Sequence, residues 1–457
     1  MEVQFNDILY RDNILIKAAA GCGKTETIVK ILDKSDKKGK FLILTHTNAG
    51  VESLIKRIKK KCIPTERYNV QTIASYCSKY VIAFPKLAKV TNLEKYNDIY
   101  NGMIRLVRNK IILQIITNTY CGLLVDEYQD CSETQHKIIK AISSVLPCKI
   151  FGDNMQGIFD FDKTSKLVDW TTVEEDFEYI GNLEYPWRWN NGNLKLGKEI
   201  IKIRKCLEEG KEIVFSNLSG GIQYIKDDDK HSDLIKKAYN LLKEKGTNVI
   251  LFSLPNESHN FARIMNGNYA SQEECERKEL IKFCENFNYS ALNILNMAKK
   301  CFTGFNKEYK SIYDNISQKK YTAKLRKNKD VYDICIALEK EFNYQDALNL
   351  LKVIENNSNI KLFRKELWSE LKRVIKEMVI SADKNIIEVA HTIRNISYKK
   401  YDYKNTISRV LLVKGLEFDN VIVVNPENMD KKLFYVAISR AKNKLIIVSK
   451  EEKIRFI

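Results

Sequence analysis

Short apolar runs alternate with amphipathic segments along the first part of the chain. The apolar runs lie at 13–16, 41–44, 69–72, 123–127 and 149–153. The segments between them, at 26–32, 48–61 and 73–81, carry apolar residues at helical spacing. Strands that alternate with helices predict a parallel sheet covered on both faces, which is an α/β fold. Polar residues end several of the runs, so we expect ligand-binding groups at the carboxyl edge of this sheet.

A second α/β pattern begins near Tyr179. Its apolar runs lie at 212–215, 221–225, 248–252, 407–412, 421–424 and 444–448. Strand signals vanish between 256 and 380, where the pattern is helical and rich in lysine. The chain is therefore expected to form two α/β domains with helical insertions. The first comprises 1–83 and 120–178 with an insertion at 84–119, and the second comprises 179–255 and 385–457 with an insertion at 256–384.

A loop of small residues follows the first apolar run and leads into a predicted helix. Its sequence is Ala18-Ala19-Ala20-Gly21-Cys22-Gly23-Lys24-Thr25. Backbone N–H groups can wrap a triphosphate only where the side chains of the loop are small. Lys24 would then bind the β- and γ-phosphates, and Thr25 would offer its hydroxyl to Mg²⁺. The spacing predicts a site for ATP and Mg²⁺, with Ala18 standing where the motif usually has glycine.

Two acids end the apolar run at 123–127, about a hundred residues after the phosphate loop. Asp126 can hold Mg²⁺ beside the Thr25 hydroxyl, and Glu127 can orient and deprotonate the attacking water. An isolated Asp-Glu pair would be read as a strand end capped by solvated acids. After a Gly-Lys-Thr loop, the same pair predicts a hydrolytic site.

The chain is strongly basic. Its 76 Lys and Arg residues against 58 Asp and Glu residues give a formal charge of +18, which favours a polyanionic partner, nucleic acid first. Lysine heavily outnumbers arginine, so the composition of the host offers a second explanation. The lysine-rich insertion is equally consistent with a DNA-binding patch and with a solvated helical face.

The cysteines and the apolar runs indicate where in the cell the protein is located. The 11 cysteines form no Cys-x-x-Cys pair, which indicates reduced thiols in a cytosolic protein. The irregular spacing of Cys275, Cys284, Cys301 and Cys335 favours ordinary cysteines over a metal cluster. Residues 1–7 do not resemble a signal peptide, and the most apolar run, 111–125, is broken by polar residues. We expect a cytoplasmic protein with no membrane span.

The two motifs and several others, taken in order, resemble the UvrD/Rep group of superfamily 1A DNA helicases. The other matching segments are 45–49, 72–76, 152–159, 183–190, 413–419 and 434–441. The resemblance covers most of the chain outside the two insertions. It implies two RecA-like P-loop motor domains, each with a mainly helical insertion. It also implies a DNA-stimulated ATPase that moves along single-stranded DNA in the 3′→5′ direction.

The resemblance implies roles for further residues of the ATP site. Gln156 would sense the γ-phosphate and couple ATP to DNA, Arg188 and Arg440 would reach the γ-phosphate, and Glu417 would contact the nucleotide. A glutamine near the N-terminus reads adenine in this group, and Gln4 is the candidate here. If cations that stabilise the γ-phosphate come from the other domain, ATP closes the cleft and hydrolysis reopens it.

By the same resemblance, two motifs contact DNA and the aromatic residues after Gln156 stack on bases. The implied DNA-binding residues are Thr45, His46, Thr47, Asn48, Thr72, Phe159 and Phe161. Asp162 replaces the arginine that usually follows, and residues 408–412 depart from the usual lead-in to the fifth motif. Phe159, Phe161, Trp187 and Trp189 are equally expected as core aromatics.

Both insertions are short for this group, which argues against efficient unwinding by the chain alone. The short form resembles the GajB subunit of Gabija phage-defence systems, which implies a nuclease partner of the OLD/TOPRIM type in DNA repair or phage defence. The alternative is an ATP- and DNA-sensing regulatory subunit that switches a partner nuclease without processive unwinding. The intact Glu127, Gln156, Arg188 and Arg440 favour turnover, and the weakened DNA motifs favour the switch.

Overall fold

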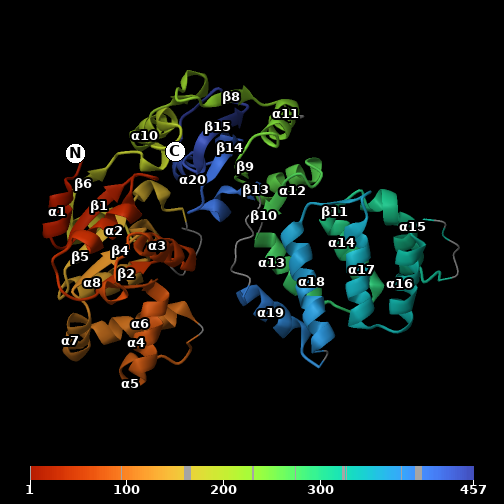
Figure 1. The fold of residues 1–457 in the computed structure, drawn as a ribbon, viewed down its shortest axis with the longest axis horizontal. Helices are drawn as coiled ribbons and strands as arrows, with labels where there is room; N and C mark the ends of the chain where they lie inside the picture. The colour runs from red at the N-terminus through yellow and green to blue at the C-terminus, as the bar shows by residue number, and fades with distance from the viewer. Residues whose placement is uncertain are drawn as a thin grey trace. The chain divides into compact units, whose positions relative to one another are not determined.

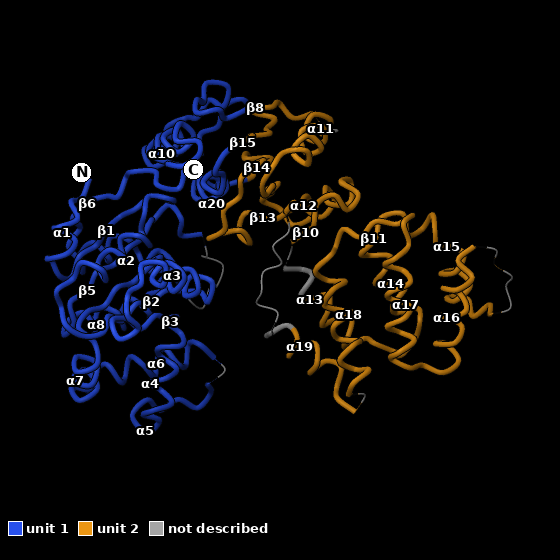
Figure 2. Tube along the Cα trace, in the orientation of Figure 1, with its two compact units in different colours: residues 1–223, 429–444, 452–457 blue, residues 224–428, 445–451 orange. Residues whose placement is uncertain are grey.

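The computed structural model describes residues 2–93, 95–158, 166–228, 231–272, 274–321, 325, 327–381, 383–396 and 404–456. The chain forms two compact units (Figures 1 and 2). The first unit contains residues 1–223, 429–444 and 452–457, and the second contains residues 224–428 and 445–451. The C-terminal part of the chain therefore contributes segments to both units.

The first unit is built on a six-stranded sheet with the order β3-β2-β4-β5-β1-β6. The strands are β1 (Ile14–Ala18), β2 (Phe41–Thr45), β3 (Tyr68–Thr72), β4 (Gly122–Val125), β5 (Cys148–Gly152) and β6 (Glu178–Leu183). Every adjacent pair is parallel. All carboxyl ends of the strands therefore lie at one edge of the sheet, as the alternating pattern predicts.

Helices bury both faces of this sheet, and alternate residues of each strand point into opposite cores. On β2, Phe41 and Ile43 pack with α1 (Phe5–Tyr10), α2 (Lys24–Lys34) and α3 (Asn48–Lys60). Leu42 and Leu44 belong to the opposite core. The helices of that core are α4 (Ile73–Ala83), α6 (Tyr96–Val107), α7 (Lys110–Thr119) and α8 (Glu133–Ser143). The short helices α5 (Pro85–Ala88) and α9 (Trp170–Asp176) complete this part of the chain.

Two further helices of the first unit carry residues of the functional site. They are α10 (Leu194–Glu208) and α20 (Lys431–Ile438). The apolar side of α10 buries Leu196, Ile200, Ile203 and Leu207 at helical spacing. Helix α20 begins at Asp430, whose side chain accepts a hydrogen bond from Leu433 N–H.

Two predicted strands lie elsewhere than the sequence pattern suggests. The run near Tyr179, expected to open a second α/β set, is β6 and pairs with β1 at the edge of the first sheet. The run at 212–215 yields only β7 (Ile213–Val214), which pairs antiparallel with β16 (Lys453–Ile454) outside both large sheets. The spacing of apolar residues predicts that a segment is an extended, half-buried strand, but it does not predict which sheet the strand joins.

A second six-stranded sheet has the order β10-β13-β9-β14-β15-β8. Its strands are β8 (Gln223–Lys226), β9 (Asn248–Phe252), β10 (Ala270–Gln272), β13 (Asn405–Arg409), β14 (Phe418–Val424) and β15 (Ala441–Ser449). The pairs β10–β13, β13–β9 and β9–β14 are parallel. Helices α11 (Ser232–Leu241) and α12 (Pro255–Ile264) pack against it. The sequence pattern missed β10 because its three residues, Ala-Ser-Gln, carry no strand signal.

The remainder of the second unit is mainly helical, as predicted for this stretch. Its helices are α13 (Glu274–Glu285), α14 (Ala291–Cys301), α15 (Phe305–Ser317), α16 (Lys329–Lys340), α17 (Tyr344–Asn356), α18 (Lys365–Ile380) and α19 (Ile386–Ile396). A two-residue ladder joins β11 (Phe302–Thr303) to β12 (Lys361–Leu362). The buried residues of these elements form one apolar core, which includes Cys284, Cys301 and Cys335.

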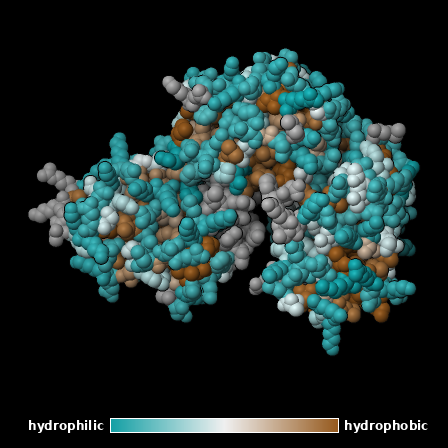
Figure 3. Space-filling view, turned by 180° about the vertical axis from the view of Figure 1, so that it is seen from behind, coloured by the Kyte–Doolittle hydropathy of each residue, from teal (hydrophilic) through white to brown (hydrophobic). Residues whose placement is uncertain are grey.

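Hydrophilic residues cover most of the face seen in Figure 3, with hydrophobic residues in separate patches. Several exposed large hydrophobic residues belong to the α4–α7 region of the first unit: Ile82, Leu87, Leu93, Tyr96 and Ile111. Among the helices of the described residues, none is both long and apolar enough to span a bilayer.

Trp368 on α18 provides a test of the helical core. It is fully buried, and its ring lies edge-on to Phe302 with a centroid separation of 4.8 Å. We expect Trp368→Ala to lower the stability of this core by about 3–5 kcal/mol. The indole N–H has no hydrogen-bond partner among the described residues, so Trp368→Phe loses no hydrogen bond, removes less apolar surface and should cost less than Trp368→Ala. Native-state hydrogen exchange of α14 and α18 measures both losses, and equal losses would contradict this account.

Candidate functional site

The phosphate loop lies between the end of β1 and the start of α2. Ala18, Ala19, Ala20 and Cys22 are buried, which leaves little side-chain bulk above the backbone. Gly21 has φ +72° and Gly23 has φ +93°, a left-handed backbone that favours glycine. Gly23 also caps the N-terminus of α2, where the free N–H groups and the helix dipole favour an anion.

Lys24 extends from the first turn of α2 into a buried position. Its Nζ lies 3.2 Å from Glu127 Oε2 and donates to the carbonyl of Ala18 at 3.4 Å. Burial alone would lower the pKa of Lys24, but Glu127, Asp153 and Asp126 outweigh that effect and raise it. Lys24 is therefore a fixed cation beside the loop.

The two acids at the end of β4 differ in their surroundings. Asp126 is buried, and burial together with the neighbouring Glu127 raises its pKa to about 7. Glu127 adopts a left-handed backbone with φ +54°, and its N–H donates to Asp126 Oδ1 at 3.0 Å. Such a conformation is strained for a residue other than glycine and is common at active sites. A buried carboxylate whose charged form is disfavoured is stabilised by a bound cation, so Asp126 and the half-buried Thr25 suit Mg²⁺.

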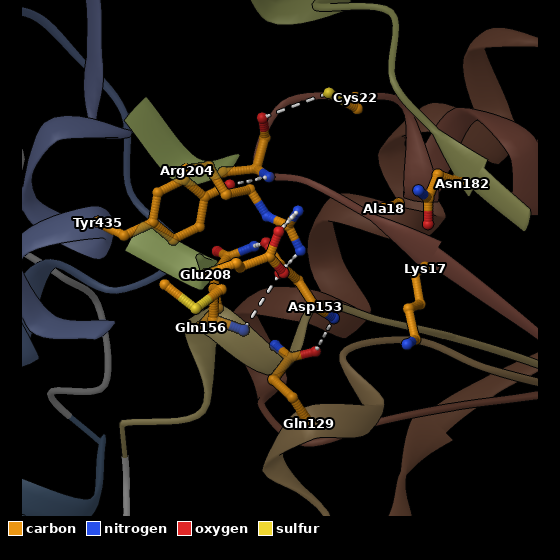
Figure 4. Close-up of polar contacts among 12 residues, drawn as sticks. Lys17, Ala18, Cys22, Gln129, Asp153, Gln156, Asn182, Arg204, Glu208 and Tyr435 are labelled. Atoms are coloured by element: carbon orange, nitrogen blue, oxygen red, sulfur yellow. Dashed lines mark hydrogen bonds and ion pairs between the residues drawn. The ribbon is translucent and has the colours of Figure 1, made fainter. Parts of the chain in front are cut away.

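Asp153, at the end of β5, is the centre of a buried hydrogen-bond network (Figure 4). Its side chain is 0% exposed. Oδ2 accepts from Gln156 Nε2 at 2.9 Å, and Oδ1 accepts from Arg204 Nη2 at 2.9 Å. Its backbone N–H donates to Gln129 Oε1 at 2.9 Å, and Gln129 Nε2 donates to Glu127 Oε2 at 2.6 Å. The Asp153 carboxylate thus joins the turn after β5 to α10, and its backbone N–H joins the end of β4.

Arg440 and Tyr435 reach this network from the C-terminal part of the chain. Arg440 is 1% exposed, and its Nη2 donates to Gln156 Oε1 at 3.2 Å. The Tyr435 hydroxyl accepts from the backbone N–H of Ala20 in the phosphate loop at 2.8 Å. Both residues belong to the same compact unit as the loop. Helix α20 therefore contacts the loop through Tyr435, and the residue Arg440 just after the helix contacts the glutamine that sequence resemblance assigned to sensing the γ-phosphate.

The segment that contains Arg188 packs directly on the phosphate loop. Arg188 N–H donates to the carbonyl of Gly21 at 3.0 Å, and Arg188 Nη1 donates to the carbonyl of Ser439 at 2.6 Å. Trp189 is 0% exposed and is a core residue, with its Nε1 donating to the carbonyl of Ala441. Trp187 is 60% exposed and lies against Gly23, so it is not a core aromatic.

The remaining residues predicted for the ATP site lie outside this cluster. Glu417 belongs to the second compact unit, where it is exposed just before β14. Gln4 is exposed at the start of α1. The other predicted residues, which are Lys24, Asp126, Glu127, Gln156, Arg188 and Arg440, lie together around the phosphate loop in the first unit.

The residues predicted to contact DNA lie mostly at the carboxyl ends of two neighbouring strands. Thr45 of β2 pairs in register with Thr72 of β3. Thr47 and Thr72 cap α3 and α4, and their side chains accept from Gly50 N–H and Ser75 N–H. Asn48 is exposed, whereas Thr45 is buried and His46 contacts Cys131 Sγ at 3.4 Å. Phe159 and Phe161 lie outside the described residues.

Models of two protein families match the chain. A model described as an AAA domain matches residues 2–162, and a model described as a UvrD-like helicase C-terminal domain matches residues 406–448. These matches support a UvrD-like helicase. The first match contains the phosphate loop and Asp126 to Gln156, and the second contains Glu417 and Arg440.

Curated relatives agree with this assignment. The helicase is 22% identical to Gabija protein GajB of Bacillus cereus (strain VD045), over 96% of this chain and 94% of the relative. It is 23% identical to ATP-dependent DNA helicase Rep of Buchnera aphidicola subsp. Schizaphis graminum (strain Sg), over 80% of this chain and 67% of the relative. These matches confirm the recognition of a UvrD/Rep-type protein resembling GajB, and the enzyme class of an ATP-hydrolysing DNA helicase.

Among solved structures, the helicase is similar to Arterivirus nonstructural protein 10, a helicase in complex with DNA. The sequence identity is 10% and the TM-score is 0.38. The match covers 95% of this chain and 60% of the length of that chain. The predicted fold class is confirmed by the two six-stranded sheets themselves, each of which contains parallel strands covered by helices.

Sequence reasoning missed several residues of the buried network. Arg204 lies within α10, where no motif marks it, and it was found only by its contact with Asp153. Gln129 and Tyr435 stand inside recognised motifs but received no role, because their partners come from other segments. The one available signal was their place in those motifs. Buried polar side chains need partners, and these partners are decided by the fold.

Gly21 provides a test of the close contact between the phosphate loop and the segment at Arg188. A Cβ on Gly21 would lie 2.7 Å from Arg188 Cβ and 2.8 Å from Trp189 Cζ3, and its φ of +72° disfavours other residues. We expect Gly21→Ala to weaken ATP binding about tenfold or more, which corresponds to about 1.4 kcal/mol. Titration with a fluorescent ATP analogue measures the dissociation constant.

Gly210 offers a matched control for this substitution. It has φ +64°, and a Cβ there would meet no atom within 4 Å. Gly210→Ala therefore tests left-handed strain without the steric contact and should leave ATP affinity unchanged. Equal affinities of the Gly21→Ala variant and the unsubstituted protein would contradict the proposed crowding.

Proposed function

We propose that this helicase uses Mg²⁺ and ATP to move along single-stranded DNA in the 3′→5′ direction, and that it works with a nuclease partner. The observation that carries the catalytic part is the continuous set of contacts Lys24–Glu127–Gln129–Asp153–Gln156–Arg440. It joins the phosphate loop, the proposed catalytic base and the proposed γ-phosphate cation within one compact unit.

In this proposal the phosphate loop binds the triphosphate through its backbone N–H groups and Lys24. The Tyr435 hydroxyl now accepts the Ala20 N–H, so binding of phosphate to that N–H would displace it. Thr25 and Asp126 would hold Mg²⁺, which supplies positive charge to the β- and γ-phosphates. The exposed indole of Trp187, beside Gly23, offers an apolar surface to the rest of the nucleotide.

Hydrolysis in this proposal depends on charge placed around the γ-phosphate. Glu127 takes the proton of the attacking water, and Gln129 keeps its carboxylate oriented. Arg188, Arg440 and Lys24 stabilise the negative charge that spreads over the phosphate oxygens in the transition state. Gln156 contacts Arg440 and lies in the turn that follows β5. A change in charge at the γ-phosphate would therefore be transmitted to the residues that follow Gln156.

Single-stranded DNA is proposed to bind along the carboxyl ends of β2 and β3, at Thr45, His46, Thr47, Asn48 and Thr72. These strands are parallel neighbours in the sheet that also carries the phosphate loop. Contacts with DNA phosphates are favoured there by the exposed side chains of Thr47 and Asn48 and by the nearby N-termini of α3 and α4. Phe159 and Phe161 remain the proposed base-stacking residues, with about 1–3 kcal/mol for each stacked base.

The nuclease partner is proposed from the similarity to Gabija protein GajB over nearly the whole of both chains. The proposed partner is an OLD/TOPRIM-type nuclease, and the biological role is DNA repair or phage defence. Movement along DNA would bring the nuclease to its substrate. A regulatory subunit that switches the nuclease without moving along DNA is the alternative.

The deciding experiment is an ATPase assay with and without single-stranded DNA, at a stated salt concentration because phosphate contacts depend on salt. We expect DNA to stimulate ATP turnover. Glu127→Gln should bind ATP and DNA but lose turnover, while Lys24→Ala should lose ATP binding. Turnover that is indifferent to DNA would favour the regulatory switch, and near-normal turnover by Glu127→Gln would exclude Glu127 as the base.

Arg440 can be tested separately from ATP binding. We expect Arg440→Gln to lower kcat about 100-fold or more, because a cation at the γ-phosphate acts mainly in the transition state. Its ATP affinity should change little, and Arg440→Lys should recover part of the activity. Lys431→Ala removes another cation and serves as the control, since Lys431 is the first residue of α20, whereas Arg440 follows the end of this helix at Ile438. Full turnover by Arg440→Gln would contradict this role.

A further inference from the structure

Arg204 is a buried cation of the ATP site that no sequence motif marks. It projects from α10, and its side chain is 12% exposed. Its Nη2 donates to Asp153 Oδ1 at 2.9 Å, and its Nη1 donates to Glu208 Oε2 at 2.9 Å. The guanidinium also lies over the Tyr435 ring, 5.9 Å from its centroid. Figure 4 shows Arg204 and Gln156 pointing toward Asp153 from different elements.

The partners of Asp153 determine how Gln156 is oriented. A carboxylate only accepts hydrogen bonds and a guanidinium only donates them. Gln156 lies between the Asp153 carboxylate and the Arg440 guanidinium, so its Nε2 must face Asp153 and its Oε1 must face Arg440. The oxygen of Gln156 therefore holds Arg440 only while Asp153 remains a charged acceptor in this position.

A second glutamine relays the position of Asp153 to the proposed catalytic base. Gln129 Oε1 accepts the backbone N–H of Asp153, and Gln129 Nε2 donates to Glu127 Oε2. The same donor and acceptor logic leaves this amide one orientation. Asp153 thus has one glutamine leading to Arg440 and another leading to Glu127 and Lys24.

Asp153 is a fully buried carboxylate, and such a charge is stable only when it is paired and hydrogen-bonded. Among the described residues, Lys24 forms no hydrogen bond with Asp153, whereas Arg204 forms a direct ion pair with it. Burial alone would lower the pKa of Arg204, but Asp153, Tyr435 and Glu208 outweigh burial and raise it. Arg204 is therefore the cation that pairs with the Asp153 carboxylate and holds it in place.

We propose that Arg204 is a positioning residue for ATP hydrolysis. Through the Asp153 carboxylate it orients Gln156 toward Arg440, while the backbone N–H of the same residue orients Gln129 toward Glu127, so that base and γ-phosphate cation are held together. This inference rests on the proposed function of the site. Arg204 acts on the arrangement of the catalytic groups, and its loss should lower kcat while leaving KM for ATP nearly unchanged.

The test compares Arg204→Gln and Arg204→Lys with Lys205→Gln in a DNA-stimulated ATPase assay. Lys205 is the next residue of α10, is 55% exposed and pairs with Glu184, so Lys205→Gln is a matched loss of charge. We expect Arg204→Gln to lower kcat about tenfold or more, as for other residues that orient a catalytic group. Arg204→Lys should recover part of this loss because it keeps the positive charge, and Lys205→Gln should behave like the unsubstituted protein.

A double variant separates positioning from stability. Arg204→Gln combined with Asp153→Asn removes both charges and should regain much of the thermal stability lost in Arg204→Gln. It should not regain kcat, because an asparagine can donate as well as accept and no longer fixes the Gln156 amide. Recovery of normal kcat in the double variant, or equal kcat in Arg204→Gln and Lys205→Gln, would overturn the proposal. A protein with no ATP turnover before substitution would instead count against the proposed function.

Discussion

The ATP site depends on one buried charge, the carboxylate of Asp153. A carboxylate removed from water must be matched by donors on every side, and here they come from Gln156, Arg204 and Met155 N–H. Two separate segments of the chain, the turn after β5 and helix α10, are brought to one point by this requirement. The contact between Gln156 and Arg440 follows from it, because the Gln156 amide has only one orientation that satisfies both of its neighbours.

The parallel sheet explains why this charge lies beside the phosphate loop. β1, β4 and β5 are neighbours in the first sheet, and all three end at the same edge. The loop follows β1, the acids follow β4, and Asp153 follows β5. Residues far apart in the sequence therefore lie close together at this edge of the sheet. The helicase places its cation, its proposed base and its proposed sensor after adjacent strand ends, where Gln129 and Gln156 connect them.

The far wall of the site comes from segments that are distant in sequence but belong to the same compact unit. Arg188 packs on Gly21, and the Tyr435 hydroxyl takes the Ala20 N–H. The loop is thus held by contacts that ATP would have to replace or rearrange. In the proposed cycle, occupancy of the loop is communicated through these contacts to α20 and α10, and DNA bound at the ends of β2 and β3 shares the same sheet.

The sequence by itself determined the strands β1 to β5 of the first sheet, the phosphate loop and the acids Asp126 and Glu127, because the spacing of hydrophobic residues and a loop of small residues are local properties. Motif order was enough to recognise the UvrD-like helicases. Only the tertiary structure decided that β6 joins the first sheet, that β10 exists, and that Trp189 is buried while Trp187 is exposed. The role of Arg204 was also decided only by the tertiary structure, because its partner Asp153 is 51 residues away. No local pattern encodes which buried carboxylate a helical arginine will pair with.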